Sequence, residues 1–125
     1  MNHILLPDGQ GSRPNSAGVN SMEVLINALI KLGAKKARLK AKLFGGARMV
    51  AGLSDIGALN SDFSRRFLRA EGIDCIGESL GGTSPRRIQF WPYHGRVRQR
   101  ISENREFGDE CKPTSQIVEN DVELF

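Results

Sequence analysis

Four side chains in this sequence can act as nucleophiles or as general acids and bases near neutral pH: His3, His94, Cys75 and Cys111. The thiolate is the nucleophilic form of cysteine, and an adjacent imidazole produces it by accepting the thiol proton. The resulting imidazolium can then protonate a departing amine or ammonia. These four residues do not have the spacing of a zinc site, so we predict no metal. We also predict no cofactor.

Three of the four residues have settings that disfavour a catalytic role. Cys75 lies in the apolar run 73–80, where cysteine is ordinarily a small buried side chain. Cys111 lies in an acidic segment, and neighbouring carboxylates raise a thiol pKa and so lower its reactivity. His94 lies in a predicted hairpin loop, where we expect a solvent-facing turn residue. We therefore predict that neither cysteine is a catalytic nucleophile.

His3 lies in a short apolar run, Asn2–Leu6, which Pro7 ends. The run predicts a buried strand that begins almost at the first residue. A single histidine at the start of a strand is usually a structural residue. Its type and position alone therefore do not assign it a role.

Hydrophobic periodicity predicts the first helix that would position these residues. Residues 7–18 are rich in Gly, Ser, Asn and Pro and predict a loop. Apolar residues then recur at three- and four-residue steps over residues 22–32, which predicts an amphipathic helix. We expect Asn20 or Ser21 to cap its start and Gly33 to end it.

A second helix and two strands follow from the same rules. Apolar residues recur at helical spacing over residues 56–70, and Gly72 ends the pattern. Apolar runs at Leu39–Phe44 and Ile73–Leu80 predict strands, each followed by a glycine pair that favours a tight turn.

The last predicted element is a β-hairpin whose strands flank the four-residue loop 92–95. The predicted order is then β-α-β-α-β-β-β. This order indicates an α/β fold, a layered sandwich in which two main helices pack on a mixed sheet.

The composition of the chain fits one globular domain, with 125 residues of which 39% are hydrophobic and 26% charged. Its apolar runs are much shorter than the ~20 residues that a membrane span needs, and no secretory leader pattern opens the sequence. We therefore predict a cytoplasmic protein with reduced cysteines and no membrane insertion.

The charge is divided unevenly along the chain. Residues 1–101 hold 16 basic and 7 acidic residues, a net charge of +9, whereas residues 102–125 hold 2 and 7, a net charge of −5. We predict a folded basic domain over residues 1–101 and an acidic, disordered tail over residues 102–125.

Five arginines concentrate in the predicted hairpin: Arg86, Arg87, Arg96, Arg98 and Arg100. A cationic surface of this kind favours an anionic partner. A nucleic-acid-binding module usually adds several stacking aromatic side chains, so we expect an acidic protein and no nucleic acid. A small nucleic-acid-binding module is the alternative, and a steep loss of affinity with salt would reveal it.

Three segments together resemble the motifs of CheD, the chemoreceptor glutamine deamidase family of bacterial chemotaxis: MNHILLP at Met1–Pro7, AKLFGGA at Ala41–Ala47, and LGGTSPRRI at Leu80–Ile88, followed by GRV at 95–97. The predicted helix over residues 22–33 and the segment 63–73 also match the family's pattern. The resemblance covers residues 1–101, and it rests on the order and spacing of the motifs together.

The resemblance implies a CheD-like α/β/α sandwich and hydrolysis of selected glutamines on methyl-accepting chemotaxis receptors to glutamate, with release of ammonia. The family uses a cysteine nucleophile, a histidine and a third polar residue. His3 matches the family's histidine, which implies that it is the catalytic general acid and base. By the same resemblance, five further residues would contact the substrate: Asn2, Gly45, Gly46, Gly82 and Thr83.

The chain departs from the family in one respect. The family's cysteine and threonine precede this histidine, whereas only Met1 and Asn2 precede His3 here. We therefore expect Met1 to be an internal methionine of a longer reading frame, the domain to be incomplete at its N-terminus, and the chain alone to be inactive. The alternative is a non-catalytic CheD-like protein that binds receptors or a CheC-type phosphatase.

Overall fold

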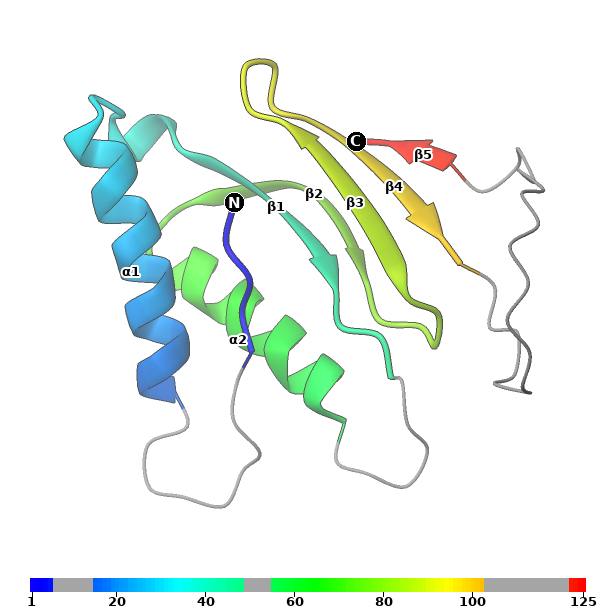
Figure 1. The fold of residues 1–125 in the computed structure, drawn as a ribbon. Coiled ribbons are helices and arrows are strands. Elements are labelled where there is room, and N and C mark those ends of the chain that lie inside the picture. The colour runs from blue at the N-terminus through cyan, green and yellow to red at the C-terminus, as the bar shows by residue number, and fades with distance from the viewer. Residues whose placement is uncertain (6–14, 49–54, 103–121) are drawn as a thin grey trace. The chain divides into compact units, whose positions relative to one another are not determined.

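The structure is a computed structural model that describes residues 1–5, 15–48, 55–102 and 122–125 (Figure 1). The chain divides into two compact units, Met1–Gly82 and Thr83–Phe125. The first unit holds α1 (Asn15–Lys31), a 3-10 helix η1 (Lys36–Arg38), β1 (Lys40–Gly45), α2 (Ile56–Ala70) and β2 (Asp74–Leu80). The second holds β3 (Arg86–Trp91), β4 (Arg96–Ile101) and β5 (Val122–Leu124). Two helices with both parallel and antiparallel strand pairs confirm the α/β class.

Helix α1 begins earlier than the sequence predicts. It starts at Asn15, inside the stretch expected to be a loop, so the prediction that Asn20 or Ser21 caps it is wrong. Three residues explain the longer helix, because Val19, Met22 and Ile26 lie on one face and all pack in the core. The core-facing stripe thus begins before residue 22.

The C-terminal end of α1 confirms the predicted glycine stop. The N–H of Gly33 donates to the carbonyl of Ile30 at 2.9 Å, and the N–H of Ala34 donates to the carbonyl of Leu29 at 3.0 Å. These two bonds form the Schellman motif, which satisfies carbonyls that the last helical turn leaves without a partner.

Helix α2 is capped at both ends. The side chain of Asp55 accepts a hydrogen bond from the N–H of Ala58 at 2.9 Å, which satisfies one free donor of the first turn. At the other end, Gly72 has a φ of +66°, and the N–H of Ile73 donates to the carbonyl of Leu68 at 2.9 Å. Neither α1 nor α2, the long helices of the described ranges, is long and apolar enough to cross a membrane.

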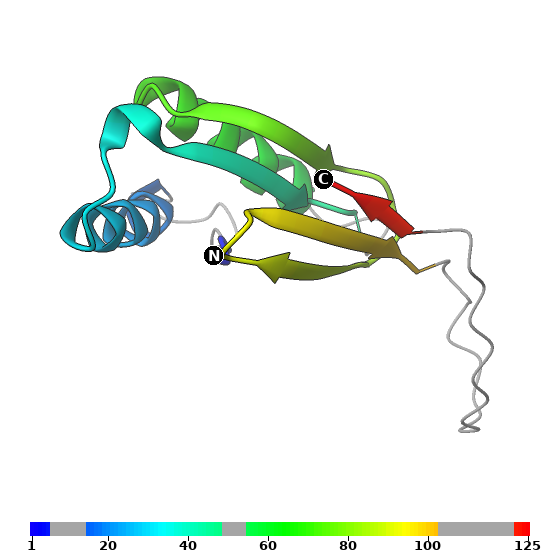
Figure 2. The ribbon, with the colours of Figure 1, turned by 90° about the horizontal axis from the view of Figure 1, so that it is seen from above.

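Strands β1 and β2 run side by side and parallel, as the predicted strands allow (Figure 2). Ala41 pairs with Cys75 and Lys42 with Gly77, so Ile76 is an extra residue that forms a bulge. The bulge interrupts the alternation of side chains, and both Cys75 and Ile76 are exposed. The prediction that Cys75 is buried is therefore wrong.

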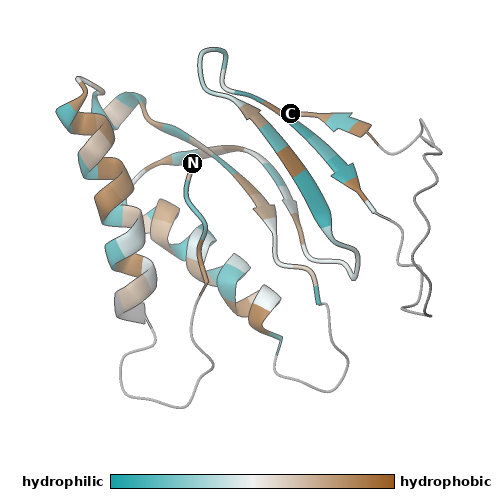
Figure 3. Cartoon of the chain, viewed as in Figure 1, coloured by the Kyte–Doolittle hydropathy of each residue, from teal (hydrophilic) through white to brown (hydrophobic). Residues whose placement is uncertain are grey.

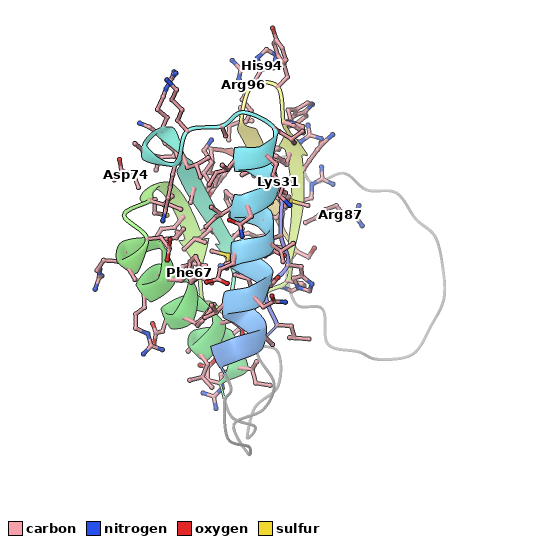
Figure 4. All side chains as sticks on the ribbon, turned by 90° about the vertical axis from the view of Figure 1, so that its left-hand side faces the viewer. Lys31, Phe67, Asp74, Arg87, His94 and Arg96 are labelled. Carbon is pink, nitrogen blue, oxygen red and sulfur yellow. The ribbon has the colours of Figure 1, made fainter. Side chains whose placement is uncertain are left out.

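The core of the first unit joins both helices to the strands. Its buried members are Met22, Ile26, Phe63, Phe67, Leu68 and Ile73. The rings of Phe63 and Phe67 lie 6.1 Å apart at a tilt of 35°, a favourable aromatic arrangement. Figure 3 shows the hydrophobic residues along α1, and Figure 4 shows Phe67 on α2.

The N-terminal segment packs on this core without forming a strand. Residues 1–5 are irregular, and Leu5 is 69% exposed, so the prediction of a buried strand is wrong for the part of Asn2–Leu6 that the structure describes. A strand needs a neighbour that completes its backbone hydrogen bonds. Here the side chains, rather than the backbone, attach the segment to α1.

The second unit is a three-stranded antiparallel sheet with the order β3-β4-β5. The predicted hairpin is confirmed, since Trp91 pairs with Arg96 across a loop of the four residues 92–95. Strand β5, which the sequence does not predict, pairs with β4, and Val97 and Phe125 exchange backbone hydrogen bonds of 2.9 and 2.8 Å. Residues 103–121 lie outside the described residues, so the domain division at residue 101 stays a prediction.

Candidate functional site

His3 lies at the surface of the first unit, between two residues that attach its segment to the protein. The amide nitrogen of Asn2 donates to the hydroxyl of Ser21 at 2.8 Å, and that hydroxyl donates to the amide oxygen of Asn2 at 3.0 Å. On the other side of His3, the side chain of Ile4 packs against the core. Because residues 2 and 4 face the protein, the imidazole of His3 faces solvent. None of the described residues forms a hydrogen bond with its ring.

The carboxyl ends of β1 and β2 are joined by backbone hydrogen bonds. The N–H of Gly81 donates to the carbonyl of Gly45 at 2.9 Å, and the N–H of Arg48 donates to the carbonyl of Gly82 at 2.8 Å. The two glycine turns that the sequence predicts therefore lie beside one another at one end of the parallel pair.

Gly46 is the point of closest approach between this turn and α2. It has a φ of +67°, and a Cβ atom added there would overlap the Ser61 hydroxyl and lie 2.8 Å from the carbonyl oxygen of Gly57. Ser61 cannot easily move aside, because it is buried and its hydroxyl donates to that same carbonyl at 2.8 Å. Only glycine fits at position 46 without a shift of the backbone.

A pocket of about 200 Å³ lies between these turns and the start of α2. Its lining residues are Gly46, Arg48, Leu80, Gly81 and Gly82 around the strand ends, with Asp55, Ala58, Ser61, Asp62 and Arg65 on or just before the helix. Ligands of α/β proteins commonly bind at the carboxyl ends of parallel strands, next to a helix N-terminus. Within the described ranges, nothing accepts a hydrogen bond from the N–H of Gly46 or Gly82.

The charges that line this pocket balance, with two arginines against two aspartates. Arg65 is further engaged by Glu78, to which its Nη2 and Nε donate at 2.8 and 3.1 Å. This hydrogen bonding raises the pKa of Arg65 and lowers the pKa of Glu78. Both side chains are exposed, so the pair orients the guanidinium more than it stabilises the fold. A pocket with balanced charge suits a neutral polar group better than a phosphate.

The structure brings some of the predicted site residues together and leaves others apart. Gly46 and Gly82 line the same pocket, and Gly45 is bonded to the neighbouring Gly81. Asn2 and His3 are not among its lining residues, and Thr83 is the first residue of the second unit. The roles of these residues stay predictions.

Sequence reasoning missed the polar residues that line the pocket: Arg48, Asp55, Ser61, Asp62 and Arg65. One signal for them was present, because Asp55 immediately precedes the apolar periodicity of α2, as helix caps do. The others are brought to the pocket by the packing of α2 on the strand ends, which no local pattern records.

Cys75 lies on β2, at the bulge of the parallel strand pair. Its Sγ donates a weak hydrogen bond of 3.4 Å to the carbonyl of Gly77. It lines a second pocket, of about 480 Å³, whose charged lining residues are Arg65, Arg69, Asp74 and Glu78, and neither His3 nor His94 lines it. His3, the histidine of the same unit, neither lines this pocket nor forms a hydrogen bond with the thiol. Cys111 lies outside the described residues. His94 is exposed in the hairpin loop, as predicted.

The sequence of the pocket and its supporting elements matches a known family. The family model described as CheD chemotactic sensory transduction matches residues 5–101. This chain belongs to the CheD family. The resemblance that the three motifs predict is thereby confirmed, and the matched range contains every residue that lines the two pockets.

Relatives within the CheD family match the chain at about half of the aligned positions. It is 50% identical over 134 residues to a probable chemoreceptor glutamine deamidase CheD of Caulobacter vibrioides, covering 100% of this chain and 72% of the relative. A protein of the same name from Sinorhizobium medicae is 44% identical over 136 residues, covering 100% and 74%. Another, from Acidiphilium cryptum, is 54% identical over 107 residues, covering 81% and 56%.

Proposed function

We propose that this protein deamidates glutamine side chains of methyl-accepting chemotaxis receptors in the cytoplasm. Each carboxamide and one water become a glutamate carboxylate and an ammonium ion. The observation that carries the proposal is the 50% identity, over all of this chain, to a relative named a probable chemoreceptor glutamine deamidase. A cytoplasmic location is part of the proposal, because the thiol that such chemistry uses persists in a reducing compartment.

In this proposal His3 is the general acid and base. A carboxamide is a poor electrophile, so the reaction begins with attack by a thiolate whose proton the imidazole has accepted. The imidazolium then protonates the leaving ammonia as the C–N bond breaks and a thioester remains. Water attacks the thioester, giving its proton to the imidazole, and the thiolate departs as glutamate forms. The exposed position of His3 supports this role, since a side chain on another protein must reach the ring.

The glycine turns are the proposed binding site for polar groups that flank the substrate glutamine. The N–H groups of Gly46 and Gly82 have no acceptor among the described residues, and both glycines line a pocket of balanced charge that His3 does not line, so these N–H groups are available to a neutral carbonyl oxygen of the substrate. Gly45 and Thr83 adjoin them in sequence, and Asn2 holds the segment that carries His3. None of these assignments requires a metal or cofactor.

The second candidate is a CheD-like protein without catalytic activity. Such a protein would bind either receptors or a CheC-type phosphatase. The position of Cys75 favours it, because this exposed thiol lies on β2 in a pocket that neither histidine lines. The first candidate therefore requires a thiol other than Cys75. The two candidates differ in whether ammonia is released from receptor glutamines.

The decisive experiment compares two histidine variants made in the native gene and purified from the native host. Receptor cytoplasmic domain is the substrate, and ammonia release and conversion of glutamine to glutamate by mass spectrometry are measured. We expect His3→Ala to lower the rate by about 100-fold or more, because general acid–base catalysis contributes about 10²–10⁴. His94→Ala, which changes the other, exposed histidine, should keep the wild-type rate.

Equal rates for His3→Ala and wild type would refute the role of His3. If the wild-type protein binds receptor but releases no ammonia, the deamidase proposal is wrong and the binding protein is the function.

A further inference from the structure

One face of the β3-β4-β5 sheet carries a row of arginines. Strand register places four on one face, which we call the arginine face: Arg87, Arg96, Arg98 and Arg100. All four are exposed, and none forms an ion pair with another described residue. Glu123, the acidic residue in the described part of this unit, pairs with Gln99 and so points to the opposite face. Figure 3 shows the hydrophilic colouring of β4, and Figure 4 shows Arg87 and Arg96 extending away from the strands.

Arg98, in the middle of β4, is held in place before any partner binds. Its Nη2 donates to the side-chain oxygen of Gln89 at 2.8 Å, and its guanidinium lies 5.9 Å from the centre of the Trp91 ring. Binding usually costs entropy because long side chains become ordered. An arginine that is already ordered avoids part of that cost.

An apolar strip adjoins the arginines on the same face. Register pairs Val122 with Arg100 and Leu124 with Arg98, so both aliphatic side chains point to the same face of the sheet as these arginines. They are 40% and 74% exposed. A partner that matches this face would carry carboxylates beside apolar side chains. A protein surface can combine these groups, whereas a sugar-phosphate backbone cannot.

The aromatic residue of the face also disfavours nucleic acid. Single-stranded nucleic acid is held by stacking of bases on open aromatic rings. Here one face of the Trp91 ring is occupied by Arg98, whose guanidinium carbon lies 5.9 Å from the ring centre.

We propose that the arginine face docks an acidic helical surface of another protein, with its carboxylates on the four guanidinium groups and its apolar side chains on Val122 and Leu124. Glutamates three and four residues apart on a helix lie about 5–6 Å from one another. Arginines at alternate positions of β4 are spaced by about 7 Å, and their long side chains accommodate the difference. The inference uses no step of the proposed deamidation.

The test measures binding of a synthetic helical peptide with glutamates along one face and leucines beside them. A twin peptide has glutamine in place of each glutamate. The protein variants are Arg96→Glu with Arg100→Glu on the arginine face, and Arg66→Glu with Arg69→Glu on α2 as the charge-matched control. All four changed residues are exposed, and a melting curve checks that each variant folds.

We expect the arginine-face variant to bind the glutamate peptide about 10- to 100-fold more weakly, because two attractions become repulsions. The control variant should lose less than about threefold, and the glutamine twin should bind as weakly as the arginine-face variant does. Equal losses in the two variants would show attraction by net charge alone and overturn the proposal. Tighter binding of an oligothymidylate of equal charge, or of vesicles containing phosphatidylserine, would also overturn it. Ammonia release, measured separately, tests the deamidase proposal whatever this result.

Discussion

Replacement of Gly46 by alanine should destabilise the first unit more than the same replacement at Gly72. The two glycines have nearly equal φ angles, +67° and +66°. Both substitutions therefore carry the same cost of placing an alanine in the left-handed region of backbone conformation. They differ in surroundings, because an added Cβ at Gly72 meets nothing within 4 Å, whereas at Gly46 it overlaps the Ser61 hydroxyl and the carbonyl of Gly57.

The expected magnitudes follow from these two contributions. An alanine forced into the left-handed region costs about 1–2 kcal/mol, which is the whole effect expected for Gly72→Ala. Overfilling a packed site adds about 1–3 kcal/mol, so Gly46→Ala should cost about 2–5 kcal/mol in total. A domain is stable by only about 5–15 kcal/mol, so the larger loss is readily measured.

Urea unfolding followed by far-ultraviolet circular dichroism is the appropriate assay, because both helices belong to the first unit and dominate the signal. The quantity compared is the free energy of unfolding of each variant relative to wild type. If the two variants agree within about 0.5 kcal/mol, the close approach of the β1 turn to α2 does not exist and the pocket beside it is wrongly described.

Two further predictions concern the interior and the pH dependence. Gln99 is fully buried, and neither polar atom of its amide has a hydrogen-bond partner among the described residues. Gln99→Met should therefore keep the melting temperature or raise it by the equivalent of about 1 kcal/mol; a lower melting temperature would show that the amide is paired. Hydrogen bonding to Arg65 lowers the pKa of Glu78 in the folded protein. The pair therefore stabilises the fold at pH values above the unfolded-state pKa of about 4.3. This stabilisation is lost as the pH falls through the lower, folded-state pKa. The difference in unfolding free energy between wild type and Glu78→Gln should therefore shrink from pH 7 to pH 3, and an unchanged difference would contradict the pairing.

Some errors in the sequence-based prediction have a clear physical origin. The sequence predicts a polar cap at Asn20 or Ser21, but the apolar stripe of α1 already includes Val19 and the helix begins at Asn15. Cys75 was expected to be buried because its run is apolar. The bulge at Ile76, which depends on pairing with β1, exposes both residues instead.

The candidate site shows the same division between local and nonlocal information. The glycine turns after β1 and β2 were predicted from their residue types, and His3 from its resemblance to a family motif. The pocket was not predicted, because Arg48, Asp62 and Arg65 meet only when α2 packs across the strand ends. The arginine-rich hairpin was predicted, but the apolar strip beside it was not, since Val122 lies 22 positions after Arg100 in sequence.

Sequence alone determined the features that depend on neighbours within a few residues: the glycine stops at Gly33 and Gly72, the positions of β1, β2 and the hairpin, and the motifs that identify the CheD family. Tertiary structure decided which of these elements touch. In the folded protein, Asn2 forms hydrogen bonds with Ser21, Gly46 packs closely against α2, and β5 pairs with β4. The physical reason is that backbone conformation responds to adjacent residues, whereas pockets and docking faces form from contacts between residues far apart in the chain.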